Sequence, residues 1–235
     1  MPPIRSVHLA LWVTYALVVV MHIGALVAGS EILRWITQLL FAPLLTAALL
    51  TAMPRSTRTT TLLLCGVTCA WVGDFLGLAL PTPATPAVVL CFIAALLCYT
   101  GALFPRWSRT RDPLRIALAI PYGGVVIGLF VACADGAGAL LPVVAAYAVA
   151  LATMAFLSAG SNGLTWSGGT LFLLSSSLLA MDWFLPGASI ALSTVLVMTT
   201  YAVGHALLIG GMIHAMPQRR WTPCRSGSAL VIVEN

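Results

Sequence analysis

Eight apolar stretches separated by short polar turns dominate this sequence. They run at about residues 8–28, 32–53, 59–80, 86–104, 114–133, 138–158, 166–186 and 189–212. Most of them reach the ~20 residues that a helix needs to cross a bilayer. With 60% apolar and 7% charged residues and a mean hydropathy of +1.04, the chain cannot cover a water-soluble surface. The sequence therefore predicts an all-α polytopic membrane bundle of eight transmembrane helices.

The arginines predict how this bundle is oriented. If the N-terminus is inside, ten of the eleven arginines fall in cytoplasmic segments and only Arg34 falls on the opposite side. The ten are Arg5, Arg55, Arg58, Arg106, Arg109, Arg111, Arg115, Arg219, Arg220 and Arg225. Positive charge is retained in the cytoplasm, and this alternation requires an even number of spans. We therefore expect an integral protein of a bacterial inner membrane with both termini in the cytoplasm.

Charge and connectivity narrow the choice of partners and of domain organisation. The net charge of +5 comes from arginines beside helix ends, which indicates anionic membrane lipids as partners and no nucleic acid. Short connections make neighbouring helices antiparallel, so residues 1–216 are expected to form one domain. Residues 217–235 are expected to form a mobile cytoplasmic tail. The six cysteines are scattered without nearby partners, and the sequence predicts neither a disulfide nor a metal site.

Asp74 is the only acidic residue deep within a predicted span, in the segment CAWVGDFLGL. A carboxyl group at this depth is costly unless it faces a cavity or a partner. It can be a neutral, hydrogen-bonded packing residue, but an intramembrane acid more often has a function. Because a medium of low dielectric constant favours the neutral form, Asp74 is a candidate general acid.

His205 and Tyr201 form a polar stripe in the last span, TTYAVGHALLIGG. They are four residues apart and so share a helix face. An imidazole at this depth can pair with a carboxylate or relay a proton, although a lone helical histidine can also be a packing residue. His8, His22 and His214 are interpreted as packing or interface residues.

Further hydroxyl groups lie in other spans. The segment FLLSSSLLAMDWF contains Ser176, whose hydroxyl can bond to a preceding helix carbonyl or serve a site. Asp182 in the same segment is expected at the outer interface. Tyr99 and Tyr147 place phenols within spans, where they usually form interhelical hydrogen bonds or anchor the interface. We predict a cavity lined by Asp74, Tyr99, Ser176, Tyr201 and His205.

Five segments, in their order along the chain, resemble the YhhN-type lysoplasmalogenase family of eight-helix membrane proteins. They are WVGDFLGL around Asp74, CYTGALF, YAVALATMA, GGTLFLLSSSLLA and MTTYAVGHALLI, and the resemblance spans residues 35–212. It implies hydrolysis of the vinyl ether bond of lysoplasmalogens to a fatty aldehyde and a glycerophospho-ethanolamine or -choline. No metal or organic cofactor is expected.

The resemblance also implies roles for individual residues. Asp74 matches the Gly-Asp motif of the family and would protonate the vinyl ether, while His205 and Ser176 complete the predicted catalytic set. Tyr99, Tyr147 and Tyr201 are expected to bind the lysolipid substrate. Tyr201 and His205 would position groups or relay protons.

Three positions depart from the family pattern. Ser176 stands where the family usually has the Asp of a Ser-Asp pair, and Leu96 stands where many relatives have a histidine. Gln38 and Leu39 replace the Lys-Pro of the second helix. The missing second carboxylate leaves open a non-catalytic lipid-binding or lipid-handling protein on the same scaffold. A small-solute or proton transporter is a third interpretation, which the lack of a repeat between the halves disfavours.

Overall fold

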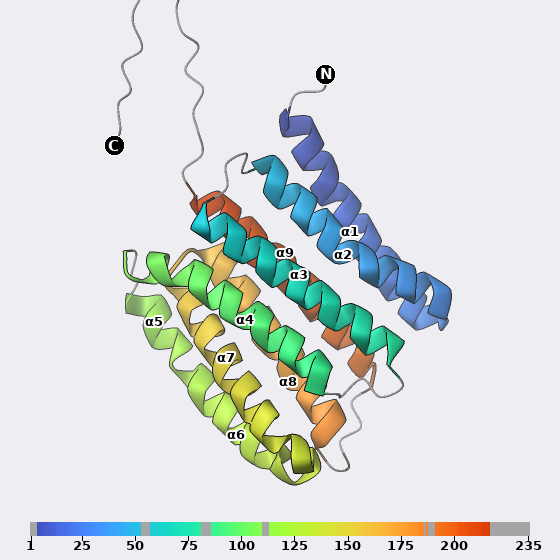
Figure 1. Ribbon diagram of the computed structural model, residues 1–235, viewed down its shortest axis with the longest axis vertical. Coiled ribbons are helices and arrows are strands. Elements are labelled where there is room, and N and C mark those ends of the chain that lie inside the picture. Colours follow the sequence, from blue (N-terminus) through green and yellow to red (C-terminus); the bar gives the residue numbers. More distant parts are fainter. Residues whose placement is uncertain are drawn as a thin grey trace, which may run out of the picture.

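The computed structural model describes residues 4–52, 57–80, 86–109, 113–185, 187 and 191–216. The predicted tail over 217–235 lies outside them. The described residues form helices and no strand, as Figure 1 shows. The elements are α1 (Ile4–Ala28), α2 (Glu31–Ala52), α3 (Arg58–Ala79), α4 (Pro86–Trp107), α5 (Pro113–Ala119), α6 (Pro121–Ala137), the 3-10 helix η1 (Gly138–Leu140), α7 (Leu141–Ala159), α8 (Gly163–Phe184) and α9 (Ser193–Ala215).

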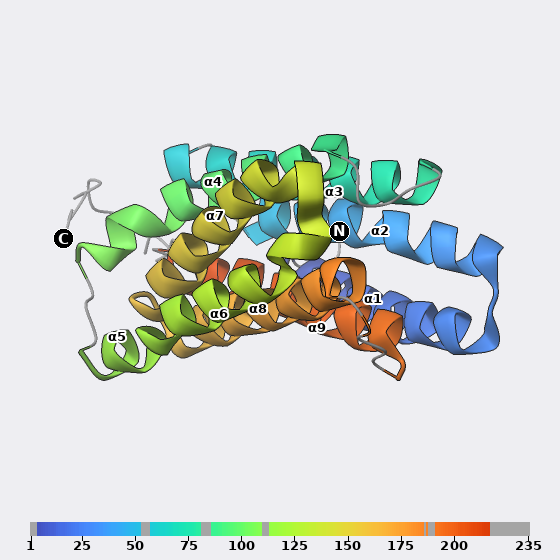
Figure 2. The ribbon, with the colours of Figure 1, turned by 90° about the horizontal axis from the view of Figure 1, so that it is seen from below.

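Within the described chain, seven helical stretches are long and apolar enough to cross a membrane. Six correspond to α1 to α4, α8 and α9, and the seventh is the continuous run Pro113–Ala159. Gly138, with a φ of 48°, turns the chain inside this run, and α6 and α7 then lie side by side (Figures 1 and 2). Length and composition thus delimit seven spans, while the count of eight stays a prediction.

Proline explains where the structure departs from the expected span over 114–133. The helix ends at Ala119 and a new one begins at Pro121, so α5 and α6 are separate elements. Proline lacks the backbone N–H that an interior helical position donates, and its ring clashes with the preceding turn. Pro121 is tolerated because it starts α6.

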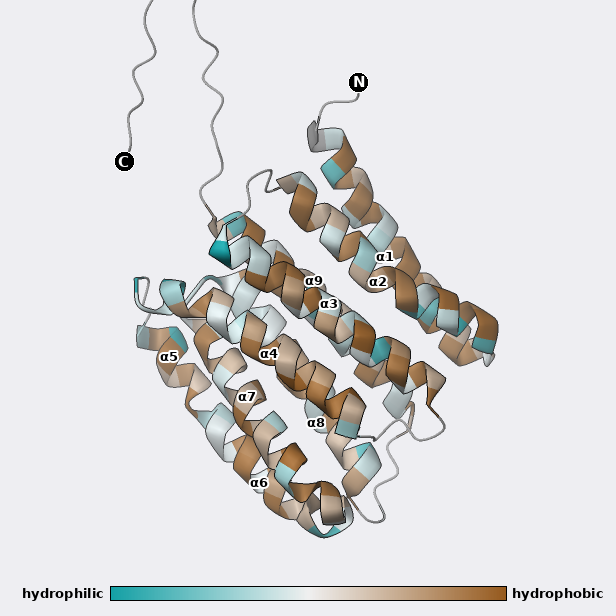
Figure 3. Cartoon of the chain, in the orientation of Figure 1, coloured by the Kyte–Doolittle hydropathy of each residue, from teal (hydrophilic) through white to brown (hydrophobic). Residues whose placement is uncertain are grey.

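Large apolar side chains cover the outside of the bundle. Exposed positions include Leu17, Val20, Leu97, Ile127 and Val131. Figure 3 shows hydrophobic colours along the length of the helices and most of the hydrophilic colours near their ends. Such a surface suits contact with lipid chains, as the sequence predicted.

Helices α8 and α9 pack closely against each other. A Cβ atom at Gly168 would overlap the backbone of Leu208, and one at Gly204 would crowd the backbone of Phe172. Small residues at such positions let membrane helices approach closely. The α6 glycines Gly123, Gly124 and Gly128 instead have no atom of the described residues within 4 Å of a Cβ position. Within this chain, close packing therefore involves α8 and α9 rather than these α6 glycines.

The two ends of the bundle differ in charge. The Arg106 guanidinium donates to the carbonyl of Ala215, and the Trp107 ring lies 4.7 Å from that of Phe156, which joins the last turns of α4, α7 and α9. The described arginines of this arginine-rich end are Arg5, Arg58, Arg106, Arg109 and Arg115. Arg34 lies at the opposite end, which we term the Arg34 end. Which end faces the cytoplasm stays a prediction.

Labelling of introduced cysteines tests both orientation and span count. In a cysteine-free background, Ser108→Cys should react with a membrane-impermeant maleimide only after cells are permeabilised, whereas Ser30→Cys should react in intact cells. Ser108, Ser30 and a third target position, Ala139, are all exposed. Ala139→Cys should behave like Ser30→Cys if α6 and α7 both cross the membrane. Labelling of Ser108→Cys in intact cells would overturn the orientation.

Candidate functional site

The third helix places Asp74 inside the bundle, five residues before its last residue, Ala79. Asp74 is 8% exposed and is the only buried carboxyl group among the described residues. Its neighbour Gly73 lets α4 approach, because a Cβ there would crowd the ring of Phe92. The carboxyl group thus faces other helices rather than lipid, as the cost of an intramembrane acid requires.

Two uncharged side chains from two other helices hold the Asp74 carboxyl group. The Tyr201 hydroxyl of α9 donates to Oδ2 at 2.9 Å, and Nε2 of Gln38 in α2 donates to Oδ1 at 3.3 Å. No basic side chain of the described residues forms an ion pair with Asp74. The site therefore combines a buried acid with neutral donors, and α2, α3 and α9 converge on it.

A buried aromatic cluster lies behind this acid. The Tyr201 ring contacts the imidazole of His205, with ring centres 5.2 Å apart, and it also packs against Phe172 and Phe92. His205 Nε2 shares a 2.5 Å hydrogen bond with the Tyr99 hydroxyl, which links α9 to α4. His205 thus reaches Asp74 by ring packing through Tyr201, and no hydrogen bond joins it to the acid.

Ser176 and Tyr147 form a separate pair between α8 and α7. Their hydroxyl groups share a hydrogen bond of 2.7 Å, and Ser176 is buried while Tyr147 is half-buried. Ser175 donates to the carbonyl of Val197 in α9 at 2.8 Å, so neither serine bonds to a carbonyl of its own helix. In the described structure no hydrogen bond or ring contact connects the Ser176 pair to Asp74.

The remaining polar groups fit structural roles. His22 is buried, shares a 2.8 Å hydrogen bond with Thr37 and packs against Phe41. His8 accepts a hydrogen bond from Trp12, and Asp182 is exposed. Within the described residues, no group of three His, Cys, Asp or Glu side chains is arranged to hold a metal ion.

Gln38 is the site residue that the sequence did not identify. In the sequence it is only a departure from the Lys-Pro of the family, yet its amide contacts the candidate acid. The sequence does show an amide side chain within an apolar helix, and such a residue usually faces a polar partner. Sequence alone does not identify that partner, since Gln38 and Asp74 belong to different helices.

This geometry permits proton transfer at a carboxyl group in an apolar surrounding. After Asp74 gives up a proton, the Tyr201 hydroxyl and the Gln38 amide are already placed to donate to the carboxylate. Donors that are fixed before the reaction need little reorganisation when charge develops. The Tyr99 hydroxyl is hydrogen-bonded to His205, and the His205 imidazole packs against the Tyr201 ring.

Comparison with known proteins gives one match. A family model described as the YhhN family matches residues 33–212, which include every candidate site residue from Gln38 to His205. No curated protein matches the chain, and no solved structure does.

Proposed function

Because the chain belongs to the YhhN family, we propose that it is a membrane hydrolase that cleaves the vinyl ether bond of lysoplasmalogens. The observation that carries the proposal is the buried Asp74 carboxyl group, which is held by Tyr201 and Gln38 and lacks an ion-pair partner among the described residues. Vinyl ether hydrolysis needs a proton donor beside an apolar chain. A general acid in a membrane protein interior supplies both.

The reaction begins with proton transfer from Asp74 to the β-carbon of the vinyl ether. The carbon–carbon π electrons form the new C–H bond, and the positive charge is shared between the α-carbon and the ether oxygen. The Asp74 carboxylate that remains stabilises this oxocarbenium ion electrostatically. Tyr201 and Gln38 hold the carboxylate oxygens in place meanwhile.

Water then completes the hydrolysis. It adds to the α-carbon while Asp74 takes up one of its protons, so the acid is restored and a hemiacetal forms. In the hemiacetal the bond from the α-carbon to the glycerol oxygen then breaks while the hemiacetal O–H becomes the aldehyde C=O. The proton of that O–H passes to the glycerol oxygen, which leaves as a hydroxyl group. The sum is one lysoplasmalogen and one water converted to one fatty aldehyde and one glycerophospho-ethanolamine or -choline.

The other candidate residues support this chemistry from a distance. His205 and Tyr99 position the Tyr201 ring, and the Tyr147–Ser176 pair contributes a polar surface for the lysolipid on α7 and α8. Ser176 takes the place of the usual family carboxylate, so a single acid both donates the proton and stabilises the cation.

A lipid-handling protein without catalysis is the second candidate function. Ser176 favours it, because its hydroxyl is hydrogen-bonded to Tyr147 and carries no charge for an oxocarbenium ion. In this case Asp74 would serve packing and substrate contact alone.

Release of aldehyde distinguishes the two functions. The purified protein in detergent should release fatty aldehyde from a 1-alkenyl lysophospholipid but not from the saturated 1-alkyl analogue, which has no π bond to protonate. Aldehyde is measured by NADH consumption with alcohol dehydrogenase. Ser176→Asp should raise the rate about tenfold if the second carboxylate stabilises the transition state by ~1.4 kcal/mol, and Ser176→Asn is the uncharged control. If wild type and Ser176→Asp both bind lysolipid without releasing aldehyde, the lipid-handling function replaces the hydrolase.

A further inference from the structure

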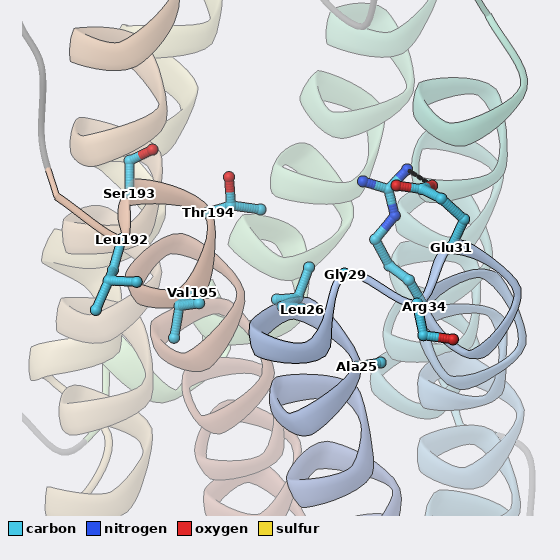
Figure 4. Close-up of a pocket in the computed structure, with 10 residues that line it drawn as sticks. Ala25, Leu26, Gly29, Glu31, Arg34, Leu192, Ser193, Thr194 and Val195 are labelled. Atoms are coloured by element: carbon cyan, nitrogen blue, oxygen red, sulfur yellow. Dashed lines mark ion pairs between the residues drawn. The ribbon is translucent and has the colours of Figure 1, made fainter.

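A pocket opens at the Arg34 end of the bundle, between the loop that joins α1 to α2 and the start of α9. Figure 4 shows Arg34 and Glu31 on one side of the opening and Ser193 and Thr194 on the other. Its volume of about 350 Å³ suits a small polar group rather than an acyl chain. Leu192 beside it has a φ of 59°, and such strained residues gather at sites that hold ligands.

The charges in the pocket match a zwitterion. Among the described residues, Arg34 and Glu31 are the only charged ones that line it, and they form an ion pair of 2.7 Å through Nη2 of the arginine. The Nε atom of Arg34 is buried and has no hydrogen-bond partner among the described residues. A guanidinium group has five N–H donors and binds phosphate well, and a carboxylate binds an ammonium group. Ser193 and Thr194 add hydroxyl donors for phosphate oxygens.

Two helices connect this pocket directly to the acid. On α2, Arg34 precedes Gln38 by four residues, so the two share a face and are about 6 Å apart along the axis. On α9, Thr194 precedes Tyr201 by seven residues, or about 10 Å along the axis. Gln38 and Tyr201 are the residues that hold Asp74.

The substrate has matching dimensions. Seven bonds separate the phosphorus atom of a lysoplasmalogen from the vinyl β-carbon, and an extended chain covers about 8 Å over that number of bonds. This length exceeds the ~6 Å axial rise from Arg34 to Gln38, the residue whose amide contacts the Asp74 carboxyl group.

We propose that this pocket binds the zwitterionic phosphate–ammonium headgroup of a lysolipid, with the phosphate at Arg34, Ser193 and Thr194 and the ammonium at Glu31. The assignment rests on the proposed hydrolase function for the placement of the chain toward Asp74. It makes the protein selective for ethanolamine or choline headgroups over anionic headgroups, because Arg34 is the only positive charge among the described residues that line the pocket.

Equilibrium binding of saturated 1-alkyl lysolipids to the purified full-length protein tests this proposal. Wild type should bind the radiolabelled phosphocholine form about tenfold more tightly than the phosphoglycerol form or a plain alkylglycerol. Arg34→Gln should bind all three alike. Arg58→Gln, which removes one exposed arginine at the other end, should keep the tenfold preference.

A second variant distinguishes loss of the headgroup preference from misfolding of the protein. Glu31→Arg combined with Arg34→Glu keeps an ion pair at the pocket but exchanges its charges, so it should retain the thermal unfolding temperature of wild type and lose the headgroup preference. Equal wild-type affinities for the three lipids, or a preference that survives in Arg34→Gln, would overturn the proposal. Competition by free glycerophosphocholine as strong as by the lysolipid would also overturn it, in favour of a site for a soluble phosphodiester.

Failure of this inference is distinguishable from failure of the proposed function. The saturated probes contain no vinyl ether, so their headgroup preference is independent of turnover. A protein that shows this preference but releases no aldehyde retains the headgroup site and loses the hydrolase function. A protein that releases aldehyde without this preference retains the hydrolase function alone.

Discussion

Replacing Asp74 with asparagine is expected to lower the turnover number for lysoplasmalogen cleavage by about 10²–10⁴-fold, the range typical of general acid catalysis. Asparagine has nearly the same shape, and its amide oxygen can still accept the hydrogen bond from the Tyr201 hydroxyl. It has no proton of suitable acidity to transfer to carbon. Aldehyde release at saturating substrate measures the loss, and binding of the saturated 1-alkyl analogue should change by less than about threefold.

Asp182→Asn is the matched control for this substitution. Asp182 is an exposed carboxyl group on α8, and removing its charge should leave turnover unchanged. Turnover of Asp74→Asn above a tenth of the wild-type value would exclude Asp74 as the proton donor. A loss of lysolipid binding together with turnover would instead indicate that Asp74 maintains the structure of the site.

Gly168→Ala is expected to destabilise the folded protein by about 1–3 kcal/mol, the usual effect of overpacking. The added Cβ would overlap the backbone nitrogen of Leu208 and crowd the carbonyl of Gly204. A backbone cannot move aside as the end of a flexible side chain can, so α8 and α9 would have to separate. Thermal unfolding in detergent, followed by tryptophan fluorescence, should show a lower transition temperature.

Gly128→Ala provides the comparison. Gly128 on α6 has no atom within 4 Å of its Cβ position, and alanine favours a helix over glycine by up to ~1 kcal/mol. The transition temperature of Gly128→Ala should therefore equal or exceed that of wild type. Equal transition temperatures for Gly168→Ala and wild type would show that the α8–α9 contact is looser than described.

The candidate site was predictable as a set of residues but not as a set of pairs. Polar groups in apolar spans must find partners, which predicts a site that contains Asp74, Tyr99, Tyr201 and His205. Their pairing followed only from the structure, which joins Tyr201 to Asp74 and Tyr99 to His205. Ser176 was expected to line the same cavity as Asp74, yet its hydrogen bond is to Tyr147. Which groups meet depends on the rotation of each helix about its axis, and the apolar spans have too little amphipathic character to fix that rotation.

The sequence by itself determined the all-helical membrane architecture, since runs of about 20 apolar residues leave the backbone no partner in lipid except its own helix. It also determined that arginines gather at one end of the bundle, since their positions along the chain follow the helix ends. Tertiary structure alone decided that Gln38 contacts Asp74, that glycines of α8 and α9 form a tight contact, and that Arg34 lines a pocket. These features depend on contacts between residues far apart in the chain, which arise from the packing of whole helices and leave no local pattern in the sequence.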